Sequence, residues 1–172
     1  SGPEPAPRVE QVRAAHQQSP EREWRSYLGD PSRDHFSPLQ QINRETVADL
    51  EVAWIYDAGD ADPAGGTQIQ FNPLVVEGVL YGASPTLRFF ALNAATGEEL
   101  WSFDPGTEVE VWTATRGAVY WAEGDEERLF FGAGPYLYAL DPVRGKPIAS
   151  FGENGRIDLR EGLGRDVGDD IM

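Results

Sequence analysis

Hydrophobic and polar positions alternate along most of this chain in short runs, separated by turns rich in glycine, proline and aspartate. Alternation with a period of two is the pattern of β-strands, in which successive side chains point to opposite faces of a sheet. The pairs Glu77-Gly78, Gly124-Asp125 and Gly134-Pro135 have the composition of tight hairpin turns. The pattern predicts an all-β protein with strands over residues 50–56, 69–76, 79–84, 87–93, 99–103, 117–122, 128–133, 136–141 and 147–151.

One hairpin unit occurs twice in the chain. Residues 91–101 combine a strand end, a turn containing Asn93 and Gly97, and a returning strand that reaches Trp101. Asn and Gly suit such a turn because they accept positive φ at low cost. Residues 139–145 repeat the unit at an offset of 48 residues. A repeat of this length, made of several short strands, is typical of β-propeller blades and predicts two four-stranded antiparallel blades.

Residues 1–22 differ from the rest of the chain and predict a flexible arm or a short helix. Val9, Val12, Ala15 and His16 have helical spacing, so we expect a surface helix with His16 on its solvent side. No second histidine lies at ligand spacing, and we therefore expect no metal at His16.

Composition and charge narrow the class of protein. The chain has 172 residues, 19 glycines, 13 prolines, no cysteine and a net charge of −15. Strong acidity disfavours nucleic acid and anionic membranes as partners. No apolar run approaches the length of a membrane helix. Residues 57–63 are acidic but lack the ligand spacing of an EF-hand, so we expect an exposed loop rather than a calcium site.

Residues 91–101 resemble the tryptophan-docking motif of quinoproteins, the dehydrogenases that use pyrroloquinoline quinone (PQQ). In that family the tryptophan stacks on the glycine of the neighbouring motif, so the resemblance implies that Trp101 joins two blades. The second copy departs from the motif, because Ala149 stands in the place of the tryptophan. The alternative is that Trp101 is an ordinary core aromatic, since a large ring buries much area wherever it lies.

Two further segments carry the same resemblance. Residues 24–56 are similar to the opening segment of quinoprotein dehydrogenases, and residues 151–165 to the excursion after their second blade. Family chains close eight blades. The resemblance implies that residues 23–172 are the N-terminal portion of such a propeller, a fragment of about two blades with open apolar faces. Its expected parts are a blade-closing strand at 50–56, a blade at 69–103, a blade at 117–151 and an excursion at 152–172.

The resemblance implies part of a PQQ-dependent dehydrogenase that oxidises a sugar or an alcohol, with calcium in its site and a quinone or cytochrome as electron acceptor. It also implies a periplasmic or secreted protein whose partners are the substrate and the remainder of the propeller. The family's alcohol-oxidising branch carries adjacent cysteines near the cofactor, so the absence of cysteine favours the glucose-type branch. The alternative is a cofactor-free propeller scaffold that binds other proteins.

The expected cofactor contacts centre on Arg116. The run from Arg116 to Tyr120 is similar to the family's Arg-Gly-x-x-Tyr segment, at the start of a blade's innermost strand. A guanidinium can bind the carboxylates of PQQ bidentately. The alternative is a surface arginine paired with an acidic residue. Thr115 and Ser84 are expected to add hydroxyl contacts, and Gln70 lies near the place of a calcium-binding glutamate in some relatives. No catalytic residue or metal ligand is named within this chain.

Overall fold

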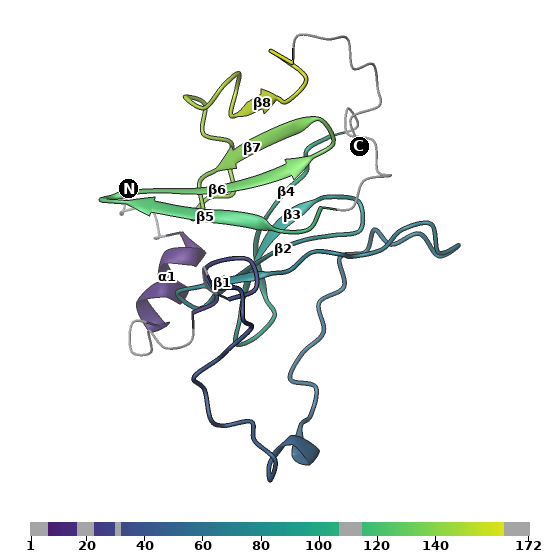
Figure 1. Ribbon diagram of the computed structural model, residues 1–172, viewed down its shortest axis with the longest axis vertical. Coiled ribbons are helices and arrows are strands. Elements are labelled where there is room, and N and C mark those ends of the chain that lie inside the picture. Colours follow the sequence, from purple (N-terminus) through teal and green to yellow (C-terminus); the bar gives the residue numbers. More distant parts are fainter. Residues whose placement is uncertain (1–6, 17–22, 30–31, 107–114, 164–172) are drawn as a thin grey trace, which may run out of the picture.

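The described part of the chain forms two four-stranded antiparallel sheets (Figure 1). The structure, a computed structural model, describes residues 7–16, 23–29, 32–106 and 115–163. In each sheet the strands are neighbours in sequence order, β1-β2-β3-β4 and β5-β6-β7-β8, as in propeller blades. The strands are β1 Leu74–Val76, β2 Val79–Ala83, β3 Phe89–Asn93, β4 Glu99–Phe103, β5 Ala118–Glu123, β6 Glu126–Ala133, β7 Tyr136–Leu140 and β8 Arg156–Asp158. The predicted all-β blade architecture is confirmed.

The hairpin turns follow from local chemistry. Glu77 and Gly78 both have positive φ, +51° and +77°, as a two-residue turn between β1 and β2 requires. Gly97 has φ +75°, and its amide donates to the carbonyl oxygen of Asn93 at 2.8 Å, which closes the turn between β3 and β4. These turns lie where the sequence predicts them.

The fourth strand of the second sheet is the main correction to the predicted strands. Residues 147–151 were expected to form it, but Pro147 makes only an isolated bridge with Leu140. Pro147 has no N–H to donate to a ladder, and the chain turns at once, with the amide of Phe151 donating to the carbonyl oxygen of Ile148 at 2.9 Å. The ladder is completed instead by β8, which pairs with β7, so the sheet continues beyond residue 151.

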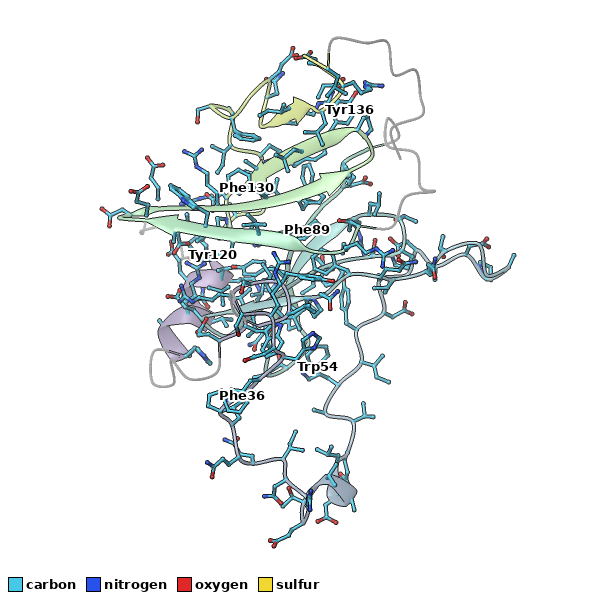
Figure 2. The ribbon with its side chains drawn as sticks, viewed as in Figure 1. Phe36, Trp54, Phe89, Tyr120, Phe130 and Tyr136 are labelled. Atoms are coloured by element: carbon cyan, nitrogen blue, oxygen red, sulfur yellow. The ribbon has the colours of Figure 1, made fainter. Side chains whose placement is uncertain are left out.

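The core lies between the two sheets. The rings of Phe89 and Phe131 stack at a centroid distance of 4.6 Å, and Figure 2 shows Phe89 between the two layers. Phe131 also stacks on Tyr138 at 5.2 Å. The closest ring pair, Phe89 with Phe131, therefore joins the two sheets to each other.

Residues 50–56 were predicted to be a strand and are not. No strand is assigned there, and the segment makes no ladder with either sheet among the described residues. Val52 and Ile55 are 77% and 84% exposed. Alternating side chains alone do not make a strand, because the backbone also needs a partner for its N–H and C=O groups. A 3₁₀ turn, η2 Val47–Asp49, precedes the segment.

The predicted N-terminal helix is present as α1, Arg8–His16. Val9 is 1% exposed and anchors the helix to the core. His16 does not face solvent as expected. Its ring lies against Gly78, where a Cβ would come within 2.9 Å of it. Gly78 has no side chain, which leaves room for the imidazole. The rest of the predicted arm, residues 1–6 and 17–22, lies outside the described residues.

Candidate functional site

The first strands of the two sheets, β1 and β5, are joined just before they begin. The backbone amide of Asn72 donates to the carbonyl oxygen of Arg116 at 3.0 Å, and the Asn72 side chain donates to the same oxygen at 3.3 Å. Asn72 and Gly117 also form a parallel bridge. The backbone at Arg116 is therefore held by the segment that leads into β1.

Arg116 itself faces solvent. Its side chain is exposed, and its guanidinium makes no ion pair with any residue that the structure describes. The neighbouring Thr115 hydroxyl donates to the carbonyl oxygen of Gly117 at 3.5 Å. Gly117 is the glycine of the Arg-Gly-x-x-Tyr segment. A Cβ there would lie 3.3 Å from the ring of Tyr27, so in this structure its open side faces that tyrosine.

Three of the predicted contact residues surround one small hollow. Gln70, Ser84 and Thr115 line it together with Leu87, and its volume is ≈ 10 Å³. That is about the space of a single water molecule. Arg116 does not line the hollow but directly follows Thr115. The structure therefore brings Gln70, Ser84 and Thr115 to one place, and the guanidinium of Arg116 follows directly in the chain.

Ser84 is buried, with 4% of its surface exposed. Its hydroxyl donates to the carboxylate of Asp60 and accepts the amide N–H of Arg88 at 3.1 Å. With both the donor and one acceptor position in use, this hydroxyl has no proton left to offer a ligand. The Ser84 hydroxyl therefore stabilises the turn that begins at this residue.

Two tryptophans lie over turn glycines. The indole of Trp101 covers Gly145, where a Cβ would come within 2.4 Å of the ring, and its N–H donates to the carbonyl oxygen of Pro142 at 2.9 Å. Trp54 covers Gly97 in the same way, with 2.7 Å to a Cβ. Its N–H donates to the carbonyl oxygen of Ala94 at 3.2 Å. Both glycines have positive φ.

The sequence analysis missed the pairing of Trp54 with Gly97, as well as Asn72 and Asp60. The signal for Trp54 was present, since Trp54 precedes Gly97 by almost the same interval as Trp101 precedes Gly145. No repeated interval of this kind marks Asn72 or Asp60, and only their contacts in the structure identify them.

The site offers binding groups rather than a catalytic pair. Within the described ranges, no group of three or more His, Asp or Glu side chains could hold a metal ion. Burial and a hydrogen bond to Glu99 raise the pKa of Tyr56 to about 12, so this phenol stays protonated at neutral pH. An exposed guanidinium with a hydroxyl and an amide nearby suits an anionic, planar ligand.

Neither helix of the described chain has the length and apolar composition of a membrane-spanning segment.

The comparisons with known proteins agree on one family. The family model described as "PQQ: Glucose/ethanol/alcohol dehydrogenase, beta-propeller domain" matches residues 24–172. The dehydrogenase subunit of the quinone-dependent alcohol dehydrogenase of Gluconobacter oxydans is 38% identical over 135 residues, 74% of this chain and 17% of the relative. The quinoprotein glucose dehydrogenase of Escherichia coli is 33% identical over 150 residues, 80% of this chain and 18% of the relative.

A solved structure is similar as well. Quinohemoprotein alcohol dehydrogenase from Comamonas testosteroni superposes with a TM-score of 0.64 and 26% identity, over 89% of this chain and 21% of that one. The chain thus spans about a fifth of the length of the relatives that it matches. Because the family model covers nearly all of the chain, and α1 alone among the described elements lies outside it, the chain belongs to the family of PQQ glucose/ethanol/alcohol dehydrogenase β-propeller domains.

Proposed function

We propose that this protein is part of a PQQ-dependent dehydrogenase that oxidises a sugar or an alcohol and passes the electrons to a quinone or cytochrome acceptor. The family match and the relatives named as alcohol and glucose dehydrogenases support this reading. The ortho-quinone of PQQ would supply the oxidising chemistry. This chain's own residues would bind and orient the cofactor. We also propose a periplasmic or secreted location, as the resemblance implies.

The observation that carries the proposal is the placement of Arg116. Its guanidinium is exposed, unpaired among the described residues, and held at the start of β5 by Asn72. In a chain with 29 acidic and 14 basic residues, an arginine without an acidic partner is one that a carboxylate-bearing ligand can use. PQQ carries three carboxylates, and a planar guanidinium binds a carboxylate through two parallel hydrogen bonds. Thr115 and Gln70 lie close enough to add polar contacts.

This chain would contribute little to the binding of a calcium ion. The ion takes about six to eight oxygen ligands, largely from carboxylates. Gln70 could offer one neutral amide oxygen, and the described residues hold no cluster of acids that would complete a cage. We therefore propose that Gln70 gives at most one ligand to an ion held mainly by other residues.

We further propose that the pairs Trp54–Gly97 and Trp101–Gly145 are the family's docking motif. Each joins a tryptophan to the turn of the next repeat, and each is closed by an indole hydrogen bond to a turn carbonyl. The cofactor-free scaffold would use the same joints. It would give no role to the exposed Arg116.

Reconstitution tests the cofactor role. Apo-protein of full length is titrated with PQQ in the presence of calcium, comparing wild type with Arg116→Ala and Arg116→Lys. Loss of a bidentate, charge-assisted contact should weaken PQQ binding by about tenfold to a hundredfold in Arg116→Ala, and less in Arg116→Lys. Arg144→Ala is the matched control, because Arg144 pairs with Asp141 at 3.0 Å in the turn that Trp101 covers.

Unchanged PQQ affinity in Arg116→Ala would remove Arg116 from the site and favour the scaffold. Glucose and ethanol are both assayed as substrates. The absence of cysteine leads us to propose the sugar, and turnover of ethanol alone would contradict that choice.

A further inference from the structure

We propose that Asp60 is a positioning residue of the cofactor site: it holds the turn at residues 84–88, and this turn forms one wall of the hollow beside Thr115. The inference rests on the proposed function. It adds a residue that makes no contact with the cofactor and acts through the turn.

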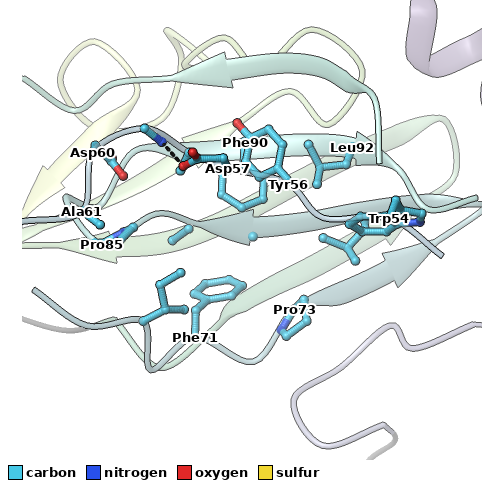
Figure 3. A pocket seen from close by; sticks show the side chains of 16 residues that line it. Trp54, Tyr56, Asp57, Asp60, Ala61, Phe71, Pro73, Pro85, Phe90 and Leu92 are labelled. Carbon is cyan, nitrogen blue, oxygen red and sulfur yellow. Dashed lines mark hydrogen bonds between the residues drawn. The ribbon is translucent and has the colours of Figure 1, made fainter. Parts of the chain in front are cut away.

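Asp60 binds both hydroxyls of that turn. One carboxylate oxygen of Asp60 accepts hydrogen bonds from Ser84 and from Thr86. Hydrogen bonds to an ionised acceptor are about twice as strong as neutral ones. The residue comes from the segment that follows Trp54, and Figure 3 shows Trp54 at one end of the groove beside β2 and β3, with Asp60 and Pro85 at the other.

The turn that Asp60 holds is strained. The amide of Leu87 donates to the carbonyl oxygen of Ser84 at 3.0 Å, and Leu87 has a φ of +67°. Three-residue hairpin loops usually place glycine at such a position, because a side chain there is unfavourable. Leu87 is nevertheless buried, with 3% exposed. A strained residue of this kind persists only where its surroundings hold it in place, and such residues gather at functional sites.

A second hydrogen bond joins the same two segments, with its donor on the turn. The guanidinium of Arg88, at the end of the turn, donates to the carbonyl oxygen of Ala58 at 2.7 Å. Both Ala58 and Asp60 are thus hydrogen-bonded to the turn. Ala58 binds the Arg88 guanidinium, and Asp60 binds the hydroxyls of Ser84 and Thr86. The second carboxylate oxygen of Asp60 and the Nε of Arg88 are buried without a hydrogen-bond partner among the described residues. Buried polar groups are seldom left in this state, which marks the cluster as more than ordinary packing.

The turn reaches the proposed cofactor site directly. Ser84 and Leu87 line the same hollow as Gln70 and Thr115. If the turn moves, the wall behind Thr115 moves with it. Binding sites tolerate displacements of only about half an ångström before affinity falls. Asp60 should therefore control PQQ affinity without touching PQQ.

The test uses the full-length protein and two independent measurements on each variant. One is the dissociation constant for PQQ of the apo-protein. The other is hydrogen exchange of the backbone amides of Leu87 and Arg88, which reports on the turn itself. The variants are Asp60→Ala, Thr86→Val, which removes a hydroxyl at constant shape, and Thr86→Ser, which keeps it. Asp57→Ala is the control, because among the described residues the Asp57 carboxylate accepts a hydrogen bond only from the nearby amide of Gly59, at 2.8 Å.

We expect Asp60→Ala and Thr86→Val to speed exchange at both amides and to raise the PQQ dissociation constant by about tenfold. Thr86→Ser and Asp57→Ala should behave like wild type. Faster exchange with unchanged PQQ affinity would reduce Asp60 to a structural residue and overturn the proposal. Weaker PQQ binding with unchanged exchange would overturn it too, because the turn would not be the route.

The two proposals fail in different ways. If wild type binds PQQ and Arg116→Ala weakens it, but Asp60→Ala does not, only the role of Asp60 is wrong. If wild type does not bind PQQ at all, the proposed function is wrong and the role of Asp60 falls with it.

Discussion

The indole of Trp101 lies over Gly145 so closely that a Cβ on that glycine would approach the ring to within 2.4 Å. Trp101 belongs to β4 of the first sheet, and Gly145 to the turn after β7 of the second. The carbonyl oxygen of Pro142 in that turn accepts the indole N–H of Trp101 at 2.9 Å and the hydroxyl of Tyr81 at 3.3 Å. Two aromatic side chains of one sheet therefore hold one turn of the other.

Removing this joint should destabilise the protein. Trp101→Ala is expected to lower the free energy of unfolding by about 3 kcal/mol, the low end of the range for truncating a core aromatic, because Trp101 is partly buried. Trp121→Phe should cost less, because Trp121 lies on β5 against Arg128 rather than between sheets. Trp112 lies outside the described residues. Chemical denaturation of the full-length protein measures the differences, and equal small losses at Trp101 and Trp121 would make Trp101 an ordinary aromatic.

The glycine side of the joint gives a separate test. Gly145→Ala should lose about 1 to 2 kcal/mol through its positive φ, and more through the clash with the indole. Gly124→Ala is the matched control. Gly124 has a similar φ, +60° against +65°, but nothing lies within 4 Å of its Cβ position. Equal losses at the two glycines would show that the indole contact carries no stability.

Arg13 should hold the far ends of the two sheets together. Its guanidinium pairs with Glu127 of β6 at 2.7 Å and with Glu77 of the β1–β2 turn at 3.3 Å. Burial alone would lower the pKa of Arg13, but Tyr81 and Glu127 outweigh it and raise the pKa. Arg13→Met removes both ion pairs, while Glu77 keeps its pair with Arg25 at 3.6 Å. The change should cost about 1 to 3 kcal/mol, below the full value for a buried pair because both acids are partly exposed.

Arg8→Met is the control for Arg13, on the same helix. Arg8 pairs with Glu98, but both side chains are largely exposed, at 50% and 62%. Exposed pairs contribute about 0 to 1 kcal/mol. If Arg13→Met lowers the free energy of unfolding no more than Arg8→Met does, by thermal or chemical unfolding, Arg13 does not hold the two sheets together.

Asp158 should make β8 sensitive to acid. Hydrogen bonds from Arg160 lower the pKa of Asp158 from 3.8 to about 2. A carboxyl whose pKa is depressed in the folded state adds stability above its unfolded pKa, and this stability is lost as the pH falls. The loss should therefore occur between about pH 4 and pH 2. NMR titration of the Asp158 carboxyl in wild type and in Arg160→Met measures the pKa of this group. A midpoint unaffected by the arginine change would contradict the role of Arg160.

The 172-residue chain expressed by itself should expose apolar surface. Phe36, Val52 and Ile55 are 70%, 77% and 84% exposed, and Figure 2 shows Phe36 on a segment that extends away from the sheets. We expect binding of a hydrophobic dye and self-association, because exposed apolar patches drive both. The double change Val52→Ser with Ile55→Ser should reduce dye binding. A monodisperse monomer that unfolds cooperatively and takes up no dye would be the contrary result.

Short-range features were readable from the sequence. The turns at Glu77-Gly78 and Gly97 depend on residues that accept positive φ, and the strands beside them depend on alternation, so neighbouring residues decide both. The repeat that contains Trp101 could be read for the same reason. The strand expected over 147–151 did not form because Pro147 has no N–H, and because the chain turns away after the single bond from the Ile148 amide to the carbonyl oxygen of Ala139.

The sequence by itself determined the β class, the hairpins, the repeat and the residue types that suit an anionic cofactor. Only the tertiary structure decided which distant groups meet. Asp60 reaches Ser84 and Thr86, Arg13 reaches Glu127, and Asn72 reaches Arg116, across intervals that no local pattern encodes. The physical reason is that φ preferences and side-chain alternation act between neighbours, whereas burial and hydrogen bonding select partners in space after the sheets have packed.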